Sequence, residues 1–217
     1  MKFSFRAIRY CHHAETGIQW LQMNFERKTA NSRKGESMKV LAMLGSPHEE
    51  GPSSVIAREV LRGAKDAGHE VVVYNRNDML IKDCQGCGAC KRAVTDCVVN
   101  DDLKPYWKEL RECGALIVSS PIYAGQVTGG MITYMNRHYC LLDKDWNVTI
   151  EPGKKLIGVF SQGMNNPDEY LPAIKWFLGD FENRKFELQD ILVHTGDMPY
   201  DADSEIMKKA YELGKNL

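Results

Sequence analysis

The sequence predicts an α/β fold in which a doubly wound, five-stranded parallel sheet carries helices on both faces. Two observations support this prediction. Five short apolar runs recur between residues 38 and 217, and segments with apolar residues at helical spacing alternate with them. Strands and helices that alternate in this way are joined by right-handed crossovers, which place helices on both sides of the sheet. No internal repeat and no second set of core-forming runs is present, so residues 38–217 are expected to form one domain.

Each element is placed by its own pattern. The predicted strands are the apolar runs 39–44, 70–74, 115–120, 155–160 and 191–194. The predicted helices cover about 54–67, 128–142, 168–177 and 204–213, and one more is expected to be capped by Asp101 and Asp102. Ligands of such sheets bind beyond the carboxyl ends of the strands. The loops after the first, third and fourth strands are therefore expected to form the binding site.

The overall composition excludes several classes of protein. The formal net charge is −1, which gives no electrostatic basis for binding nucleic acid or an acidic membrane surface. No apolar run approaches the roughly 20 residues that span a bilayer. The seven cysteines are odd in number and mostly clustered, unlike a secreted disulfide framework. A reducing, cytoplasmic location is expected.

Residues 1–37 differ from the rest of the chain. Basic residues outnumber acidic ones there, and the polar run 31–37 has the composition of a linker. The segment has no continuous apolar stretch of the kind found in secretory signals. Cys11, His12 and His13 have no second pair of metal ligands nearby. We interpret this segment as an N-terminal extension without chemistry of its own, which lies outside the core domain.

Four cysteines lie close together after the second predicted strand. Cys84, Cys87, Cys90 and Cys97 have the spacing C-x2-C-x2-C-x6-C. Bacterial-type ferredoxins open with the same spacing around a cubane cluster, whereas structural zinc usually takes two separated C-x2-C pairs. Gly86 and Gly88 would let the backbone approach a cluster closely. The pattern predicts a [4Fe–4S] cluster, and zinc or free or disulfide-bonded thiols remain as alternatives.

The loop after the first strand, residues 45–54, has the composition of a phosphate-binding turn. It leads into a helix N-terminus, where free N–H groups and the helix dipole favour an anion. Ser46, Ser53 and Ser54 add hydroxyl donors, and His48 could assist. The loop is neither a Walker A nor a G-x-G-x-x-G sequence, which argues against nucleoside triphosphate hydrolysis and a dinucleotide fold.

Two further loops suit a planar ring. Residues 120–130 form an apolar, glycine-rich turn with an aromatic residue, which could support a ring face. Residues 161–166 are small and polar, so their backbone N–H groups could meet ring heteroatoms. The three loops should meet at one edge of the sheet, beside the cysteine loop.

These motifs resemble the NADPH-dependent FMN reductase-like family of the flavodoxin fold, and within it the iron–sulfur flavoproteins. The resemblance covers about four-fifths of the chain, from residue 38 to about 215. It is carried by Gly45-Ser46-Pro47 with Ser53-Ser54, by the four-cysteine loop running into Asp101-Asp102, and by Ser120-Pro121-Ile122-Tyr123. It implies the strand order 2-1-3-4-5 and non-covalently bound FMN.

The resemblance also implies which residues hold the cofactor. The phosphate would be surrounded by Ser46, His48, Ser53 and Ser54; the isoalloxazine would lie against Pro121, Ile122, Tyr123 and Gln126; Ser161, Gln162 and Gly163 would close the far side. Some positions depart from the family pattern. His48 stands where arginine is common, and the helix after the third strand has Ile132 where lysine is usual and Asn136-Arg137 where Asp-Arg is usual.

The functional hypothesis is an FMN-dependent oxidoreductase that passes electrons between a [4Fe–4S] cluster, FMN and a small acceptor such as a quinone, an oxygen species or a disulfide. NAD(P)H or a ferredoxin-like protein would be the donor, and the resemblance implies a homodimer or homotetramer. No residue is assigned as a general acid or base. One alternative is an NAD(P)H-dependent FMN or quinone reductase without a cluster, and another is a redox sensor that uses thiols or zinc. No nucleic acid or membrane partner is expected.

Overall fold

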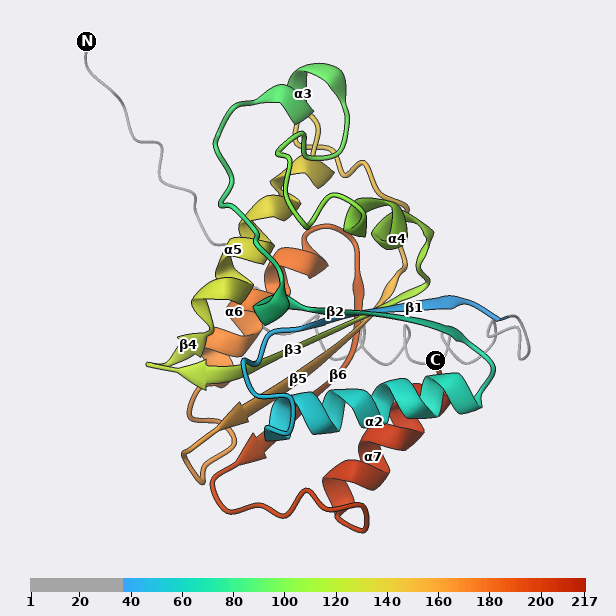
Figure 1. The fold of residues 1–217 in the computed structure, drawn as a ribbon, viewed down its shortest axis with the longest axis vertical. Coiled ribbons are helices and arrows are strands. Elements are labelled where there is room, and N and C mark those ends of the chain that lie inside the picture. The colour runs from blue at the N-terminus through green and yellow to red at the C-terminus, as the bar shows by residue number, and fades with distance from the viewer. Residues whose placement is uncertain (1–36) are drawn as a thin grey trace, which may run out of the picture. The chain divides into compact units, whose positions relative to one another are not determined.

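The computed structural model describes residues 37–217 and contains one mostly parallel sheet (Figure 1). The sheet order is β2-β1-β3-β5-β6, and the two-residue strand β4 pairs antiparallel with the end of β3. The strands are β1 (Lys39–Leu44), β2 (Glu70–Asn75), β3 (Ala115–Tyr123), β4 (Gln126–Val127), β5 (Lys155–Gln162) and β6 (Glu187–Thr195). The five long strands are parallel, so the predicted order 2-1-3-4-5 is confirmed for them.

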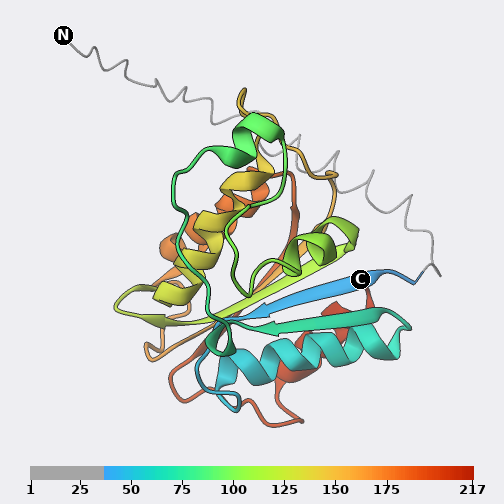
Figure 2. The same cartoon turned by 45° about the horizontal axis from the view of Figure 1, so that its top comes forward.

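Helices cover both faces of the sheet, as expected from the alternating pattern (Figures 1 and 2). One face carries α2 (Pro52–Asp66) and α7 (Glu205–Lys215), and the other carries α4 (Tyr106–Glu112), α5 (Gly129–Arg137) and α6 (Leu171–Glu182). Shorter turns are α3 (Ala89–Ala93), η1 (Arg76–Asp78) and η2 (His138–Leu141). Within residues 37–217, no helix has the length and apolar character needed to cross a membrane.

The core has two parts, one on each face of the sheet. Alternate residues of β1 point to opposite faces: Val40 and Ala42 pack towards α2 and α7, and Leu41 and Met43 pack towards α4, α5 and α6. This alternation follows from the two-residue period of a strand. Because both faces of the sheet are buried, the central strands have continuous apolar sequences, which is why they were predictable.

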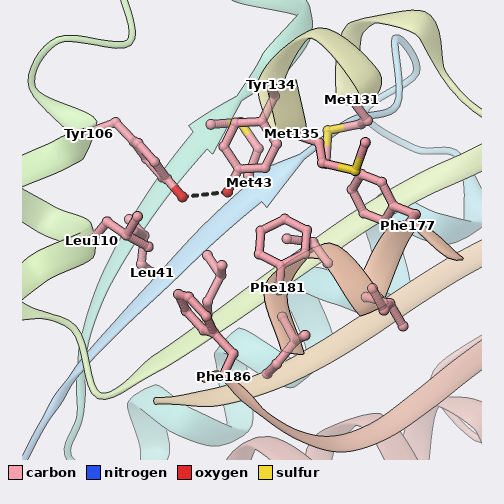
Figure 3. Close-up of a cluster of buried hydrophobic side chains, with 14 of the residues drawn as sticks. Leu41, Met43, Tyr106, Leu110, Met131, Tyr134, Met135, Phe177, Phe181 and Phe186 are labelled. Atoms are coloured by element: carbon pink, nitrogen blue, oxygen red, sulfur yellow. Dashed lines mark hydrogen bonds between the residues drawn. The ribbon is translucent and has the colours of Figure 1, made fainter. Parts of the chain in front are cut away.

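The core beneath α4, α5 and α6 is rich in aromatic side chains (Figure 3). The Tyr106 ring packs edge-on against Tyr134 and His138. Its hydroxyl group hydrogen-bonds the hydroxyl of Tyr134 and lies 3.0 Å from Nε2 of His138. Burial raises the pKa of Tyr106 well above its usual value and lowers that of His138 well below its own. These groups are therefore uncharged members of the core, and Nδ1 of His138 is buried without a hydrogen-bond partner among the described residues.

Two predicted element boundaries are wrong at functional loops. The helix expected to be capped by Asp101 and Asp102 begins instead at Tyr106, because the Asp101 carboxylate accepts the backbone N–H groups of Lys82 and Leu103. The third strand does not end before Pro121 but continues to Tyr123, where it turns into β4. The short strand β4 and the helix α3 were not predicted, since neither is long enough to show a period.

Other boundaries move by a few residues. Helix α2 starts at Pro52 rather than Ser54, because proline suits the first turn of a helix. The helix predicted over 128–142 ends at Arg137 and continues as the 3-10 turn η2. Strand β6 begins at Glu187, four residues before the predicted run, because its first half is only partly buried and has no continuous apolar sequence.

The contact between α2 and α7 depends on glycine. A Cβ atom on Gly214 would lie 1.8 Å from the carbonyl oxygen of Val60, and one on Gly63 would lie 2.1 Å from that of Tyr211. We expect Gly214→Ala to lower the free energy of unfolding by about 1–3 kcal/mol, because the helices must move apart. Urea unfolding measures this change.

Gly179→Ala in α6 is the matched control. A Cβ atom there would meet nothing within 4 Å. Since alanine is a better helix former than glycine, the free energy of unfolding should rise by up to about 1 kcal/mol. Two variants with the same stability would contradict the close approach of α2 and α7.

Candidate functional site

A cavity of about 260 Å³ lies at the carboxyl ends of β1, β3, β5 and β6. It brings together the three loops that the sequence analysis singled out. The lining residues are Ser46, His48, Gly51, Pro52, Ser53, Pro121, Ile122, Tyr123, Ser161, Gln162, Gly163, His194 and Gly196. This set contains every residue predicted to contact FMN except Ser54 and Gln126. Their role in binding FMN stays a prediction.

The part of the cavity formed by the first loop is organised by hydrogen bonds around His48. The Ser46 hydroxyl accepts the N–H of His48 at 3.1 Å, and the Ser54 hydroxyl donates to the His48 carbonyl oxygen at 3.0 Å. Ser54 therefore holds the turn and does not line the cavity. The Ser53 hydroxyl is buried and has no hydrogen-bond partner within residues 37–217. A buried donor of this kind at the start of α2 fits an anionic ligand group.

The second loop is fixed to the first by hydrogen bonds at the start of α5. The Ser120 hydroxyl accepts the N–H of Thr128 at 3.0 Å and donates to the Pro121 carbonyl oxygen. The Thr128 hydroxyl donates to the Gly45 carbonyl oxygen at 3.2 Å. These bonds leave Pro121, Ile122 and Tyr123 on the cavity wall, while Gln126, the exposed residue of β4, is not among its lining residues.

The third loop adds a second buried polar atom without a partner. The Gln162 side-chain amide donates to the Asn166 carbonyl oxygen at 2.6 Å. Its oxygen, Oε1, is buried and accepts no hydrogen bond from the described residues. An acceptor at this position can meet an N–H group of a ring, such as N3 of an isoalloxazine. With Ser53 Oγ, it shows that the residues present fit FMN.

His194 was not among the residues predicted to contact FMN. A histidine at the end of a strand is more often an ordinary core or edge residue than a ligand. In the structure the ring lines the cavity, and Nε2 donates to the Met198 carbonyl oxygen at 2.7 Å. The available signal was the place in the fold, because the ends of neighbouring parallel strands meet at one edge.

The four clustered cysteines line a second, small cavity of about 20 Å³. Gly86 and Gly88 have φ angles of 59° and 67°, in the left-handed region that suits glycine. These two residues turn the backbone so that Cys84, Cys87, Cys90 and Cys97 face the same cavity. Cys90 is buried, Cys97 is half-buried, and the other two are exposed. A fifth cysteine, Cys140 in η2, also lines the cavity and is buried; it lies outside the C-x2-C-x2-C-x6-C pattern.

The loop that carries these cysteines is closed at its base. The N–H of Leu80 donates to the Asp102 carboxylate at 2.7 Å, and the N–H of Lys82 donates to Asp101 at 3.0 Å. Burial opposes the ionisation of Asp101, but hydrogen bonds from Arg137 and from the backbone keep its pKa below the usual carboxyl value. The segment 82–101 is therefore a closed loop with a charged carboxylate at its base.

No metal site is preformed in the described residues, because no group of three or more His, Cys, Asp or Glu side chains is placed there to hold a metal ion. Among residues 37–217, those that line the cysteine cavity include no carboxylate or imidazole, so its donor set consists of soft thiols.

The cysteines differ in their expected reactivity. Burial raises the pKa of the Cys113 thiol to about 11 and that of Cys140 to about 12. Only the thiolate is a good nucleophile. In metal-free protein at pH 8, we expect iodoacetamide to label the exposed Cys84 and Cys87 rapidly, and the buried Cys113 and Cys140 only after unfolding. Peptide mass spectrometry measures the labelling rates, and equal rates for these four thiols would contradict the burial of Cys113 and Cys140.

The two cavities lie at opposite ends of α5. Its first turn is bonded to the loops of the larger cavity through Thr128, and its last residue, Arg137, lines the cysteine cavity. In Figures 1 and 2, α5 runs from the β3–β4 hairpin to the region of α3. At 1.5 Å per residue, the nine residues of α5 span about 13 Å.

A third, larger groove of about 750 Å³ lies between α6, β6 and α7. Its walls are mostly apolar, with Leu171, Val193 and Ile206 among them. Among residues 37–217, those that line this groove include no cysteine and none of the residues predicted to hold a cofactor.

Comparison with known proteins identifies the family of the chain. The NADPH-dependent FMN reductase family matches residues 38–164. The chain is 28% identical over 185 residues to an iron–sulfur flavoprotein of Archaeoglobus fulgidus, a match that covers 83% of this chain and 79% of that protein. Other curated iron–sulfur flavoproteins match over 44%, 51% and 54% of their own length.

Solved structures show the same fold at low sequence identity. An NAD(P)H:quinone oxidoreductase from Methanothermobacter marburgensis has a TM-score of 0.63 at 17% identity, covering 83% of this chain and 96% of that one. A flavodoxin from the domain Archaea has a TM-score of 0.52 at 15% identity, covering 82% and 95%. These likenesses concern the fold alone.

Proposed function

Because the chain belongs to the family of NADPH-dependent FMN reductases, we propose that it is an iron–sulfur flavoprotein that passes electrons between a [4Fe–4S] cluster, FMN and a small acceptor. Family membership makes the chain an FMN-dependent oxidoreductase. The observation that carries the finer proposal is the placement of four cysteines around one cavity, at the end of α5 opposite the cavity that fits FMN.

The larger cavity would hold FMN through three groups of contacts. The Ser53 hydroxyl and the first turn of α2, which has no side-chain cap, would bind the phosphate. Pro121 and Ile122 would support the ring, and Gln162 Oε1 would accept an N–H from it. Bound FMN supplies chemistry that the side chains lack, since it exchanges electrons in pairs, as hydride, or singly.

The cysteine cavity would hold the cluster. Cys84, Cys87, Cys90 and Cys97 would be its ligands, and the closed base of the loop would keep their spacing. A cubane cluster supplies one-electron exchange. The chain's own contribution is placement. Helix α5 spans about 13 Å between the two cavities, with Thr128 hydrogen-bonded to Gly45 at one end and Arg137 to Cys97 at the other.

The donor, acceptor and assembly belong to the same proposal. NAD(P)H or a ferredoxin-like protein would supply electrons, and a quinone, an oxygen species or a disulfide would take them. The matching family is described as NADPH-dependent, which supports a nicotinamide donor. A homodimer or homotetramer with the cofactors near the subunit interface is the proposed assembly.

The test is a measurement of iron, acid-labile sulfide and FMN per chain in anaerobically purified protein. About four irons, four sulfides and one FMN would support the proposal. One FMN per chain without iron, even after anaerobic reconstitution, would overturn the proposal of a cluster. The alternative, an NAD(P)H-dependent FMN or quinone reductase, would then remain. A colourless protein loaded with zinc would instead favour a thiol-based sensor.

A further inference from the structure

The Arg137 side chain contacts the sulfur of one predicted cluster ligand, Cys97, and has no chemical part in the function proposed above. Nε of Arg137 donates to Sγ of Cys97 at 3.3 Å. The Arg137 side chain has an exposed fraction of 0%, and it lines the cysteine cavity. An arginine is always charged, so this contact places a buried positive charge directly on one of the four sulfurs.

The rest of the guanidinium group is tied to the base of the cysteine loop. Nη1 of Arg137 donates to the Lys82 carbonyl oxygen at 2.7 Å and to one carboxylate oxygen of Asp101. Nη2 of Arg137 donates to the other Asp101 oxygen at 3.4 Å. The Asp101 side chain has an exposed fraction of 2%. A buried pair of this kind has a fixed geometry, because neither group can turn to water. The positive charge of Arg137 is therefore held beside the Cys97 sulfur.

The other cations near the loop make different contacts. Arg92 donates to the Cys87 carbonyl oxygen, and Lys91 donates to the carbonyl oxygens of Tyr139 and Leu142. Arg111 pairs with Asp96, next to Cys97, but is about one-third exposed and has no bond to sulfur. In the described residues, Cys97 is the cysteine of the four whose sulfur accepts a hydrogen bond from a cationic side chain.

We propose that Arg137 is a positioning residue that holds Cys97 and stabilises the reduced form of the cluster. The inference rests on the proposed function, because it needs the cluster to be present. Reduction adds a negative charge, part of which lies on the ligand sulfurs. A hydrogen-bonded cation stabilises that charge and raises the reduction potential, and outer contacts of this kind are known to tune metal sites. Asp101 has the opposite influence, because its carboxylate partly cancels the charge of Arg137.

The test is the midpoint potential of the cluster, measured by an EPR-monitored redox titration of the full chain. Arg137→Gln should lower the midpoint potential by about 59 mV, which corresponds to a tenfold shift of the one-electron equilibrium towards the oxidised cluster. Asp101→Asn should shift the potential in the other direction, since it leaves the charge of Arg137 uncancelled. A merely structural role would not produce shifts of opposite sign.

Two further variants complete the design. Arg137→Lys keeps the positive charge, so its midpoint potential should stay close to that of the wild type. This variant distinguishes the effect of the charge from the effect of the arginine's shape and packing. Arg111→Gln is the matched control, because it removes a nearby charge that does not contact sulfur. Its shift should be less than about twofold, since the pair is partly exposed and screened. Iron and sulfide are measured in every sample, so a lost cluster is not mistaken for a shifted potential.

The outcomes separate the inference from the proposed function. A wild-type protein that takes up no iron overturns both. An intact cluster whose potential is the same in wild type, Arg137→Gln and Asp101→Asn overturns the inference alone. If neither variant folds, pulsed EPR of the reduced wild type labelled with ¹⁵N-arginine gives the answer. A nitrogen coupling that persists in Arg92→Gln and Arg111→Gln supports the contact, and its absence overturns it.

Discussion

Replacing Cys87 by serine is expected to remove nearly all iron and sulfide from the protein and to leave its FMN in place. The serine hydroxyl is a hard, weakly acidic ligand that does not replace a thiolate on iron. Cys87 is exposed at the mouth of the cysteine cavity, so the substitution should leave the fold intact. FMN should remain, because its predicted cavity lies at the other end of α5. Iron, sulfide and flavin analyses measure the three contents.

Cys140→Ala is the matched control for this experiment. Cys140 lines the same cavity but lies outside the C-x2-C-x2-C-x6-C pattern, and its thiol is buried. The variant should keep its iron and lose only some stability, since a small cavity replaces the sulfur. Iron retained in Cys87→Ser and lost in Cys140→Ala would show that Cys140, rather than Cys87, is a ligand. Loss of FMN together with iron in Cys87→Ser would contradict two independent cofactor sites.

Replacing Ser53 by alanine is expected to weaken FMN binding by roughly ten- to 150-fold, without lowering the stability of the cofactor-free protein. A hydrogen bond to a charged group contributes about 1.5–3 kcal/mol. The Ser53 hydroxyl has no partner within the described residues, so removing it breaks no bond in the absence of ligand. Removing a buried, unpaired hydroxyl should leave the free energy of unfolding equal or slightly higher.

Ser54→Ala is the matched control, one residue along the same helix. Both side chains are buried, but the Ser54 hydroxyl donates to the His48 carbonyl oxygen. Its loss should reduce the stability of the cofactor-free protein by about 0.5–1.5 kcal/mol. Titration calorimetry with FMN and urea unfolding measure the two effects. If Ser53→Ala destabilises the apoprotein and leaves FMN affinity unchanged, Ser53 is not the phosphate donor.

The residue pattern predicted the sheet because parallel strands are buried on both faces. The runs at 39–44 and 115–120 had to be continuous and apolar, and they form the centre of the sheet. Elements that are very short, or half-buried without a continuous apolar run, carry no such signal. The edge strand β6 was therefore predicted too short, and α3 and β4 were not predicted.

The candidate site was predictable in its loops and less so in its individual contacts. The ends of parallel strands meet at one edge, which brought the three loops together around one cavity. Ser53 and Ser54 have the same chemistry in the sequence, yet one hydroxyl is unpartnered and the other fixes the turn. The difference arises from where each side chain points on the first turn of α2.

The sequence by itself determined the fold class, the strand order implied by the family resemblance, the four clustered thiols and the three loops that surround the larger cavity. The fold class, the thiols and the loops follow from local composition and spacing, whereas the strand order follows from the resemblance. Only the tertiary structure decided that Arg137 donates to Cys97, forty positions earlier, and that Cys140 joins the cysteine cavity. Such contacts depend on how α5 and η2 pack beside the cysteine loop. No period or spacing in the chain specifies that packing, because it is set by the shapes of side chains that meet only after folding.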